Sequence, residues 1–370
     1  MRKIKVDLGI HSYDILIGRN ILDEAAEFIA NSSSFTKKVL IVTDSNIIAR
    51  CAGKFTDALS KRNINFETAV IPAGESSKSL QEAEKLYTRA IEMGMDRKSV
   101  IIALGGGVVG DLAGFVAATF MRGIPFIQIP TSLLAQVDSS VGGKVAVNHQ
   151  LGKNLIGAFY QPKAVFIDLD FLATLPPREI KSGLGEIVKY GIIRDAEFFA
   201  YIEDNVKKIL QCDLDVLEHL IYRSCQIKAE VVSADEREAG ERMILNFGHT
   251  IAHAIEAATN YKVYSHGEAV SVGMVGAAII SNSLKLIDLS VVSRIQALLD
   301  NLNLVTKIND CSVDELFNLL LRDKKTFNGK VHWVLINQIG STCINSSVPS
   351  DIVKNAIFKI SGGCRYDNEN

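Results

Sequence analysis

The chain has 370 residues, of which 48% are hydrophobic and 22% are charged. This composition is ordinary for a soluble globular protein and excludes a disordered chain, a collagen and a coiled coil, while the length favours two domains that each bury a core. The 40 basic and 42 acidic residues give a net charge of −2, so we expect no binding to nucleic acid or to an anionic membrane.

Cysteine spacing and apolar runs bear on the cellular compartment. The six cysteines are scattered and form no C-x-x-C pair, which is typical of reduced thiols and argues against a thiolate zinc site. The N-terminal MRKIKVDLGI lacks the apolar core of a secretory signal. The longest apolar stretch, residues 269–280, is interrupted by glycine and shorter than the ~20 residues of a membrane span. We therefore expect a cytoplasmic protein that does not enter a membrane.

The first half of the chain alternates between strand-like and helix-like segments. A helical pattern over residues 81–93 lies among short β-branched or apolar runs, which predict strands over residues 38–43, 65–71, 99–104, 124–129 and 165–169. Continuous apolar strands separated by helices are typical of a parallel sheet covered on both faces. We predict an α/β domain over residues 1–175 with a mostly parallel, Rossmann-like sheet.

The pattern changes after residue 175. Apolar residues recur with helical spacing in six segments, residues 185–193, 197–210, 216–232, 250–259, 269–284 and 291–302. A single strand-like run occupies residues 331–336. We predict a mainly α-helical, metal- and substrate-binding domain over residues 176–370, with the active site between the two domains.

A glycine-rich segment follows the strand predicted at residues 99–104. Gly105, Gly107 and Gly110 satisfy G-x-G-x-x-G between this strand and a helix, where backbone N–H groups can approach a pyrophosphate. The alternative is a tight turn without a ligand. The pattern also wants an acidic residue about 20 positions further on; that residue is missing, and Asp44 or Glu75 is the better candidate.

Three of the seven histidines lie within 18 positions. His249 and His253 are four apart, so they share one face of a helix, and His266 follows closely. Glu186 and Lys189 share a face of another predicted helix. Two imidazoles and one carboxylate suit a catalytic zinc, but three histidines for two places leave the ligand set open, and hydrogen-bonded core histidines are the alternative.

Lys144 and Lys153 are set in loops rich in Gly, Ser and Asn, and further cationic residues occur elsewhere in the chain. Together they could clamp a phosphorylated and carboxylated small molecule, although single lysines are usually solvated surface residues. The candidates are Arg122, Lys144, Lys153, Lys189, Lys228, Arg242, Lys324 and Lys325, with Asp138, Asn148 and Asn154 beside them.

Longer motifs are more specific than any of these single patterns. The chain contains LGGGVVGDLAGFVAATFMRGIPFIQIPTSLLAQVDSSVGGK, LGKNLIGAF, GEIVKYG, RMILNFGHTIAHAIE and HGEAV, in that order. With these motifs the chain resembles the 3-dehydroquinate synthase family over nearly its whole length. Val145, Ala146 and Ala252 depart from the family pattern, each conservatively in size.

The resemblance implies an NAD-dependent lyase with one divalent metal ion, zinc or else cobalt, that works as a homodimer. It implies that 3-deoxy-D-arabino-heptulosonate 7-phosphate is converted to 3-dehydroquinate and phosphate. Transient oxidation, phosphate elimination, reduction, ring opening and an intramolecular aldol step would follow one another in each turnover. This is the second step of the shikimate pathway to chorismate and the aromatic amino acids.

The resemblance also assigns residues. The metal ligands would be Glu186, His249 and His266, which leaves His253 for proton transfer or substrate contact. NAD would contact Asp44, Glu75, Lys78, Gly107, Val108, Val109, Gly110, Asp111, Thr131, Ser132, Lys153 and Thr174. The substrate would contact Arg122, Asp138, Lys144, Asn154, Lys189, Lys228, Arg242, Asn246, His253 and one of Lys324 and Lys325, with Lys325 favoured. Of these, Lys144, Asn154, Lys189 and His253 would be catalytic.

Three other functions remain open. One is a net oxidoreductase similar to the metal-dependent glycerol dehydrogenases, and another is a related cyclase that makes 2-deoxy-scyllo-inosose or a valiolone. The related cyclases act on substrates without the same carboxylate, so Lys228, Arg242 and Asn246 favour the synthase. A non-catalytic binding protein would be expected to lack a metal ligand, and none is lacking here.

Overall fold

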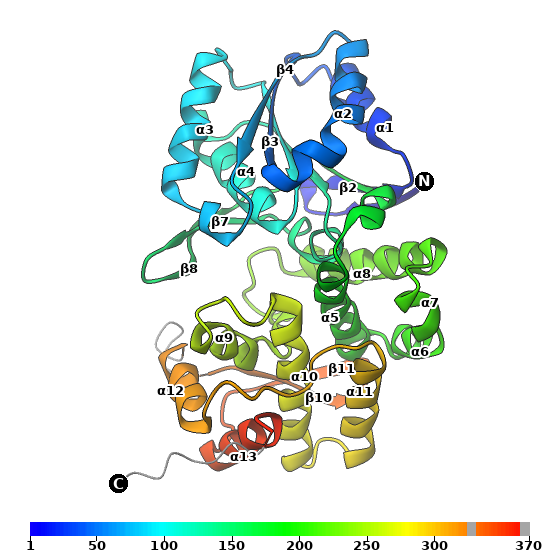
Figure 1. Cartoon of the computed structure of the whole chain (residues 1–370), viewed down its shortest axis with the longest axis vertical. Coiled ribbons are helices and arrows are strands. Elements are labelled where there is room, and N and C mark those ends of the chain that lie inside the picture. The colour runs from blue at the N-terminus through cyan, green and yellow to red at the C-terminus, as the bar shows by residue number, and fades with distance from the viewer. Residues whose placement is uncertain (324–330, 363–370) are drawn as a thin grey trace. The chain divides into compact units, whose positions relative to one another are not determined.

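The computed structural model describes residues 1–323 and 331–362, and its contacts divide them into two compact units (Figure 1). The first unit comprises Met1–Ile180 and Ile221–Arg237, and the second comprises Lys181–Leu220 and the chain from Glu238 onward. The division differs from the predicted domains at residues 176–180 and 221–237, which join the first unit. The Lys228 ammonium donates 2.6 Å hydrogen bonds to the backbone and side-chain oxygens of Asp138, and the Arg2 guanidinium lies 4.8 Å from the Tyr222 ring centre.

The first unit is built on a seven-stranded sheet with the order β1-β2-β9-β6-β5-β3-β4. β1 pairs antiparallel with β2, and all the other pairs are parallel. This confirms the mostly parallel, Rossmann-like sheet and all five predicted strands; the edge strand β1 and its neighbour β2 were not predicted. The strands are β1 (Arg2–Val6), β2 (Tyr13–Gly18), β3 (Lys38–Asp44), β4 (Asn65–Ile71), β5 (Val100–Gly105), β6 (Phe126–Pro130) and β9 (Ala164–Asp168).

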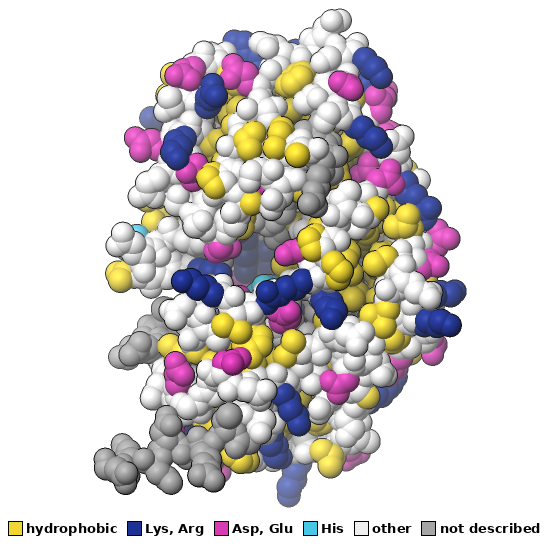
Figure 2. Space-filling view, viewed as in Figure 1, with side chains coloured by type: hydrophobic (Ala, Val, Ile, Leu, Met, Phe, Trp, Pro, Cys, Tyr) yellow, Lys and Arg dark blue, Asp and Glu magenta, His cyan; other side chains and the backbone are white. Residues whose placement is uncertain are grey.

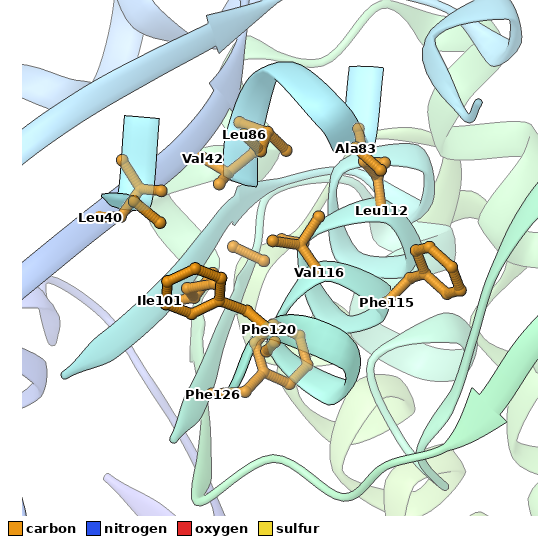
Figure 3. Packing of buried hydrophobic residues seen from close by; sticks show 14 of the residues in the cluster. Leu40, Val42, Ala83, Leu86, Ile101, Leu112, Phe115, Val116, Phe120 and Phe126 are labelled. Atoms are coloured by element: carbon orange, nitrogen blue, oxygen red, sulfur yellow. The ribbon is translucent and has the colours of Figure 1, made fainter. Parts of the chain in front are cut away.

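Helices cover both faces of this sheet. Along β3, Val39 and Ile41 pack against α1 (Leu22–Asn31) and α2 (Ser45–Lys61), while Leu40 and Val42 pack on the other side. Figure 3 shows the second cluster, in which α3 (Leu80–Glu92) and α4 (Gly107–Thr119) cover the strands with Leu86, Leu112, Val116 and other residues. Successive strand side chains point to opposite faces, so apolar residues on both faces are what a doubly covered strand requires.

A two-stranded hairpin, β7 (Lys144–His149) and β8 (Gly152–Phe159), follows the sheet strand β6. It contacts α4, where a Cβ on Gly114 would overlap the Val145 side chain. The segment was expected as loops, and as strands it holds Lys144, Lys153 and Asn154 on a fixed backbone.

The second unit is mainly helical, which confirms the predicted class. Every predicted helical segment after residue 175 falls in a helix to within one residue, except that residues 197–210 are split at Asn205, the C-cap of α6. The segment predicted at residues 216–232 lies mostly in the first unit. The predicted strand at residues 331–336 is β10 (Trp333–Gln338), which pairs with β11 (Ser341–Asn345). The helices from residue 177 on are α5 (Pro177–Arg194), α6 (Ala196–Asp204), α7 (Val206–Leu210), α8 (Leu214–Ala234), α9 (His249–Ala258), α10 (His266–Ser283), α11 (Leu289–Asn301), α12 (Val313–Asp323) and α13 (Ser350–Ile360).

The surface carries charges of both signs. Figure 2 shows basic and acidic side chains interspersed over the visible face of the protein, in keeping with the net charge of −2. Within residues 1–323 and 331–362, no helix is long and apolar enough to cross a membrane.

Candidate active site

Glu186, His249 and His266 meet in the second unit. Glu186 lies in α5 and is fully buried, His249 is the first residue of α9, and His266 is the first residue of α10. The Nε2 atoms of His249 and His266 lie 3.5 and 3.6 Å from Glu186 Oε1. One ligand atom from each residue lies within 4.8 Å of the other two, and no second group of this kind occurs among the residues described.

Glycines let the backbones that carry these three side chains touch. A Cβ on Gly267, next to His266, would overlap the carbonyl oxygen of Ser182, one turn before Glu186 in α5. A Cβ on Gly185 would lie 2.7 Å from the Gly267 carbonyl oxygen. Gly248 precedes His249 and has a φ of 79°, a left-handed backbone conformation that residues other than glycine rarely adopt. The spacing of the three ligands therefore depends on backbone contact between α5 and the start of α10.

Charged groups around Glu186 shift the pKa of both imidazoles. Burial, with the nearby Lys189 ammonium, lowers the pKa of His249 to about 3. Burial alone would also lower the pKa of His266, but hydrogen bonds with Glu186 and Glu256 outweigh it and raise that pKa to about 10. The lowered pKa favours the neutral form of His249, which metal binding requires, whereas a metal cation would compete with a proton at His266.

The donor set fits a divalent metal ion. A carboxylate and two imidazoles are the ligands of catalytic zinc sites, which keep further positions open for substrate. Glu256 Oε1 lies 3.4 Å from His266 Nδ1 and leaves Nε2 of the same ring directed at Glu186. A carboxylate behind a ligating imidazole is the usual arrangement at such sites.

His253 does not join this group. Its ring centre lies 5.7 Å from that of His249, and it is exposed on α9. Lys189, which is 1% exposed, forms an ion pair with Glu186 one turn away in α5. His253 and Lys189 therefore lie beside the candidate metal group rather than in it.

In the first unit, residues predicted to contact NAD gather at one edge of the sheet. The parallel strands β3, β5 and β6 end at Asp44, Gly105 and Pro130, and parallel strands end at the same edge. The N-terminus of α4 opens there at Gly107, followed by Val108, Val109, Gly110 and Asp111, and Thr131 and Ser132 follow β6.

The glycines of this loop allow α4 to pack closely on the sheet, and they also allow a pyrophosphate to approach the backbone. A Cβ on Gly110 would lie 2.8 Å from Gln128 Oε1, so α4 packs tightly on β6. Asp44 caps α2 by accepting backbone N–H bonds from Asn46 and Ile47. An open helix N-terminus at the carboxyl edge of a parallel sheet suits the pyrophosphate of a dinucleotide.

A polar cluster extends from this edge. Lys78 is buried, and its ammonium donates to the carboxylate of Asp111 and to Asn154 Oδ1. Burial raises the pKa of Asp111, and the Lys78 ammonium opposes this shift. Lys153 Nζ lies 3.7 Å from Glu75 Oε1. The Asn148 amide donates to Glu75 and accepts from the Asn154 N–H, so four residues predicted for NAD and one predicted for substrate are in one network.

Thr174, also predicted to contact NAD, follows a different strand. It ends the 3₁₀ segment η5 (Leu169–Thr174) after β9, where its hydroxyl donates to the Phe171 carbonyl. Its predicted role toward NAD stays a prediction.

The residues predicted for substrate fall into two sets, one in each unit. In the first unit, Lys228 of α8 is paired with Asp138, while Lys144 is exposed at the start of β7. Arg122 is exposed, with a φ of 67°.

In the second unit, Arg242 is buried in the 3₁₀ segment η6 (Glu241–Asn246), and Asn246 donates a 2.7 Å hydrogen bond to Glu238. Lys324 and Lys325 lie outside the described residues.

Sequence reasoning missed two polar residues of these clusters. Glu256 is a lone acid in the apolar α9, seven residues after His249 and so on the same helical face, and this spacing could have revealed it. Glu238, by contrast, lies outside any helix or strand with a φ of 61° and had no sequence signal.

Comparison with known proteins identifies the family. The family model of the 3-dehydroquinate synthase N-terminal region matches residues 68–182, and that of the C-terminal region matches residues 183–326. The 3-dehydroquinate synthase of Desulforamulus reducens is 48% identical over 349 residues, which cover 94% of this chain and 97% of that protein.

Solved structures of related cyclases have the same fold. A 2-deoxy-scyllo-inosose synthase complexed with carbaglucose-6-phosphate, NAD⁺ and Co²⁺ is 29% identical with a TM-score of 0.88, over 97% of this chain and 100% of that one. The 2-epi-5-epi-valiolone synthase of Streptomyces hygroscopicus, with NAD⁺ and Zn²⁺ bound, is 25% identical with a TM-score of 0.86, over 95% and 97%. The two matched regions and the near full-length identity show that this chain belongs to the 3-dehydroquinate synthase family.

Proposed function

We propose that the chain converts 3-deoxy-D-arabino-heptulosonate 7-phosphate to 3-dehydroquinate and phosphate, the second step of the shikimate pathway. The observation that carries the proposal is the buried Glu186 carboxylate between His249 and His266 in a chain of this family. The reaction is a phosphate elimination without net oxidation, so the enzyme is a carbon–oxygen lyase. In one turnover the substrate is oxidised before the elimination and reduced after it. Ring opening and aldol closure then complete the reaction.

The cofactors proposed are NAD and one divalent metal ion, zinc or cobalt. Glu186, His249 and His266 would hold the metal, and the residues at the carboxyl edge of the sheet would hold NAD. When bound, zinc supplies a Lewis acid and NAD⁺ a hydride acceptor. Two cyclases of the same fold, with NAD⁺ and Co²⁺ or with NAD⁺ and Zn²⁺ in their structures, support this choice.

The chain's own side chains would bind and orient an anionic substrate. Lys228 and Arg242 are buried cations, and cations held in a fixed position neutralise phosphate and carboxylate groups at low reorganisation cost. Lys144 and Asn154 lie on the two strands of one hairpin, which fixes their spacing. The exposed imidazole of His253 would exchange a proton with substrate or solvent, while Lys189 stays buried against Glu186.

A related cyclase is the nearest alternative function. The identity of 48% to a 3-dehydroquinate synthase, against 29% and 25% to the two related cyclases, supports the synthase. Lys228, Arg242 and Asn246, which suit a substrate carboxylate, support it as well.

The test follows phosphate release from 3-deoxy-D-arabino-heptulosonate 7-phosphate with NAD⁺, with NADH absorbance recorded in parallel and a chelator arm added. We expect catalytic phosphate release, no build-up of NADH, and loss of activity on chelation that added zinc restores. NADH formed one-for-one with the substrate consumed would indicate a dehydrogenase. If there is no phosphate release, sugar phosphates without a carboxylate would test the related cyclases.

We propose further that the enzyme works as a homodimer in the cytoplasm, as the family resemblance implies. Sedimentation of the purified chain tests the dimer: a mass of about twice the 40.4 kDa of one chain is expected, and a monomer at micromolar concentration would contradict it.

A further inference from the structure

Asn148 links two segments that carry residues predicted for NAD and substrate. It lies in β7 close to the turn of the hairpin and is half-buried. Its backbone N–H donates a 2.8 Å hydrogen bond to the Lys78 carbonyl, and its Nδ2 donates a 2.8 Å hydrogen bond to Glu75 Oε1. Its Oδ1 accepts a 3.0 Å hydrogen bond from the Asn154 N–H. One residue thus joins β7, β8 and the loop around η2 (Glu75–Ser77).

The two side-chain bonds require an amide. The Glu75 carboxylate only accepts hydrogen bonds, and the Asn154 N–H only donates one, so the side chain between them must do both. Aspartate has the same shape but would face Glu75 with a second carboxylate. Alanine would make neither bond.

The partners of Asn148 continue the network. Asn154 has a φ of 56°, a left-handed conformation that costs energy and is held here by the bond to Asn148. Asn154 Oδ1 then accepts from Lys78, which also binds Asp111, and Glu75 lies near Lys153. Asn148 therefore controls where several predicted ligand contacts point.

We propose that Asn148 is a positioning residue for the dinucleotide: it holds Glu75, Lys78 and Asn154 in the arrangement that NAD binding requires. This inference rests on the proposed function. Groups held in place before binding lose less conformational freedom when the ligand arrives, so a preordered loop binds more tightly. Releasing this loop would weaken NAD binding without removing any group that touches NAD.

The first test is titration calorimetry of NAD⁺ into the zinc-loaded Asn148→Asp variant. We expect the dissociation constant for NAD to rise at least tenfold, with zinc affinity unchanged. The melting temperature without NAD should fall by only a few degrees, because β7 and β8 keep their backbone pairing. If the Asp variant does not fold, Asn148→Ala, which adds no charge, decides instead with the same expected loss.

A double variant separates positioning from a general structural role. Adding Glu75→Gln to Asn148→Asp exchanges the donor and the acceptor. The new amide at position 75 can then donate a hydrogen bond to the new carboxylate at position 148. We expect the double variant to bind NAD at least threefold more tightly than the two single losses combined predict. Purely additive losses would contradict the pairing of these two side chains.

Asn345→Asp is the matched control. Asn345 also lies in a hairpin strand, and its Oδ1 accepts a 2.8 Å hydrogen bond from the Ser347 N–H. This variant should bind NAD as the unaltered chain does. If the unaltered chain binds no NAD, the proposed function fails. If it binds NAD and the folded Asn148→Asp variant binds within twofold of it, only the inference about Asn148 is overturned.

Discussion

At the residue scale, the two histidines of α9 allow a test of the metal-ligand assignment, with His253 as the control for His249. His249 lies 3.5 Å from Glu186, whereas His253 is exposed one turn further on. We expect His249→Ala to lose zinc and to abolish turnover while NAD still binds, because the residues predicted to contact NAD lie in the other unit. His253→Ala should keep its zinc and lose activity only. Metal analysis of both purified variants checks this; equal zinc content in the two would contradict the assignment of His249.

Glu256 allows a second prediction at this scale. Its carboxylate lies 3.4 Å from His266 Nδ1 and orients that imidazole toward Glu186. Because such carboxylates strengthen the ligand, we expect Glu256→Gln to raise the zinc dissociation constant about tenfold or more. Competition with a fluorescent zinc chelator measures it. Glu241→Gln, which removes an exposed carboxylate paired with Arg194, is the control and should leave zinc affinity unchanged.

The sequence could predict this site only in part. The three histidines were found by their closeness in the chain, but helical spacing favours His249 with His253, not His249 with His266. Which imidazole faces Glu186 depends on how α9 and α10 pack, and only tertiary contacts through glycine decide that. Glu256 was missed because a single acid in an apolar helix has no motif of its own.

At the element scale, Gly267 sets the distance between α5 and α10. A side chain there would overlap the Ser182 carbonyl, and backbone cannot rotate away as a flexible side chain can. We expect Gly267→Ala to destabilise the protein by about 1–3 kcal/mol, the usual cost of overpacking, and to weaken zinc binding as Glu186 and His266 separate.

The control for this prediction is the same substitution in α2. A Cβ on Gly53 would have no neighbour within 4 Å, and the residue is exposed in the helix. Gly53→Ala should therefore stabilise the protein by about 0.5–1 kcal/mol, since alanine loses less backbone entropy in a helix. Urea unfolding measures the free energy of unfolding of both variants. If both are less stable than the unaltered chain, the close contact at Gly267 does not explain the loss.

Periodicity predicted the buried strands and the long helices but not every strand. The central strands are apolar on both faces and stand out in the sequence. β1 has only two buried residues among charged ones, and β8 leaves Leu155 and Phe159 exposed. Strands without a continuous buried face lack the pattern that sequence reasoning detects, and so the hairpin that carries Lys153 and Asn154 was expected as a loop.

At the scale of the whole molecule, the sequence did not reveal that residues 221–237 belong with the first unit. Helical spacing shows that α8 has an apolar face but not what that face packs against. The contacts of Lys228 with Asp138 and of the Cys225 thiol with the Gln136 carbonyl, 3.2 Å away, decide it. Lys228, a residue of the second half of the chain that is predicted to contact substrate, is in this way built into the unit that carries the residues predicted to contact NAD.

The two units should respond to different ligands when the protein unfolds. The chain has one tryptophan, Trp333, which is buried in β10 of the second unit, so its fluorescence reports on that unit alone.

A ligand at 100 times its dissociation constant stabilises the state that binds it by about 2.7 kcal/mol. We expect zinc to raise the urea midpoint of the Trp333 transition. Circular dichroism reports on the helices of both units, so NAD without zinc should raise the midpoint of a transition seen by circular dichroism and leave the Trp333 midpoint in place. His249→Ala should abolish the zinc shift and keep the NAD shift. A Trp333 midpoint that moves equally with NAD and with zinc would mean that the two units unfold as one, and the separate assignment of metal and dinucleotide would then need direct binding measurements on each variant.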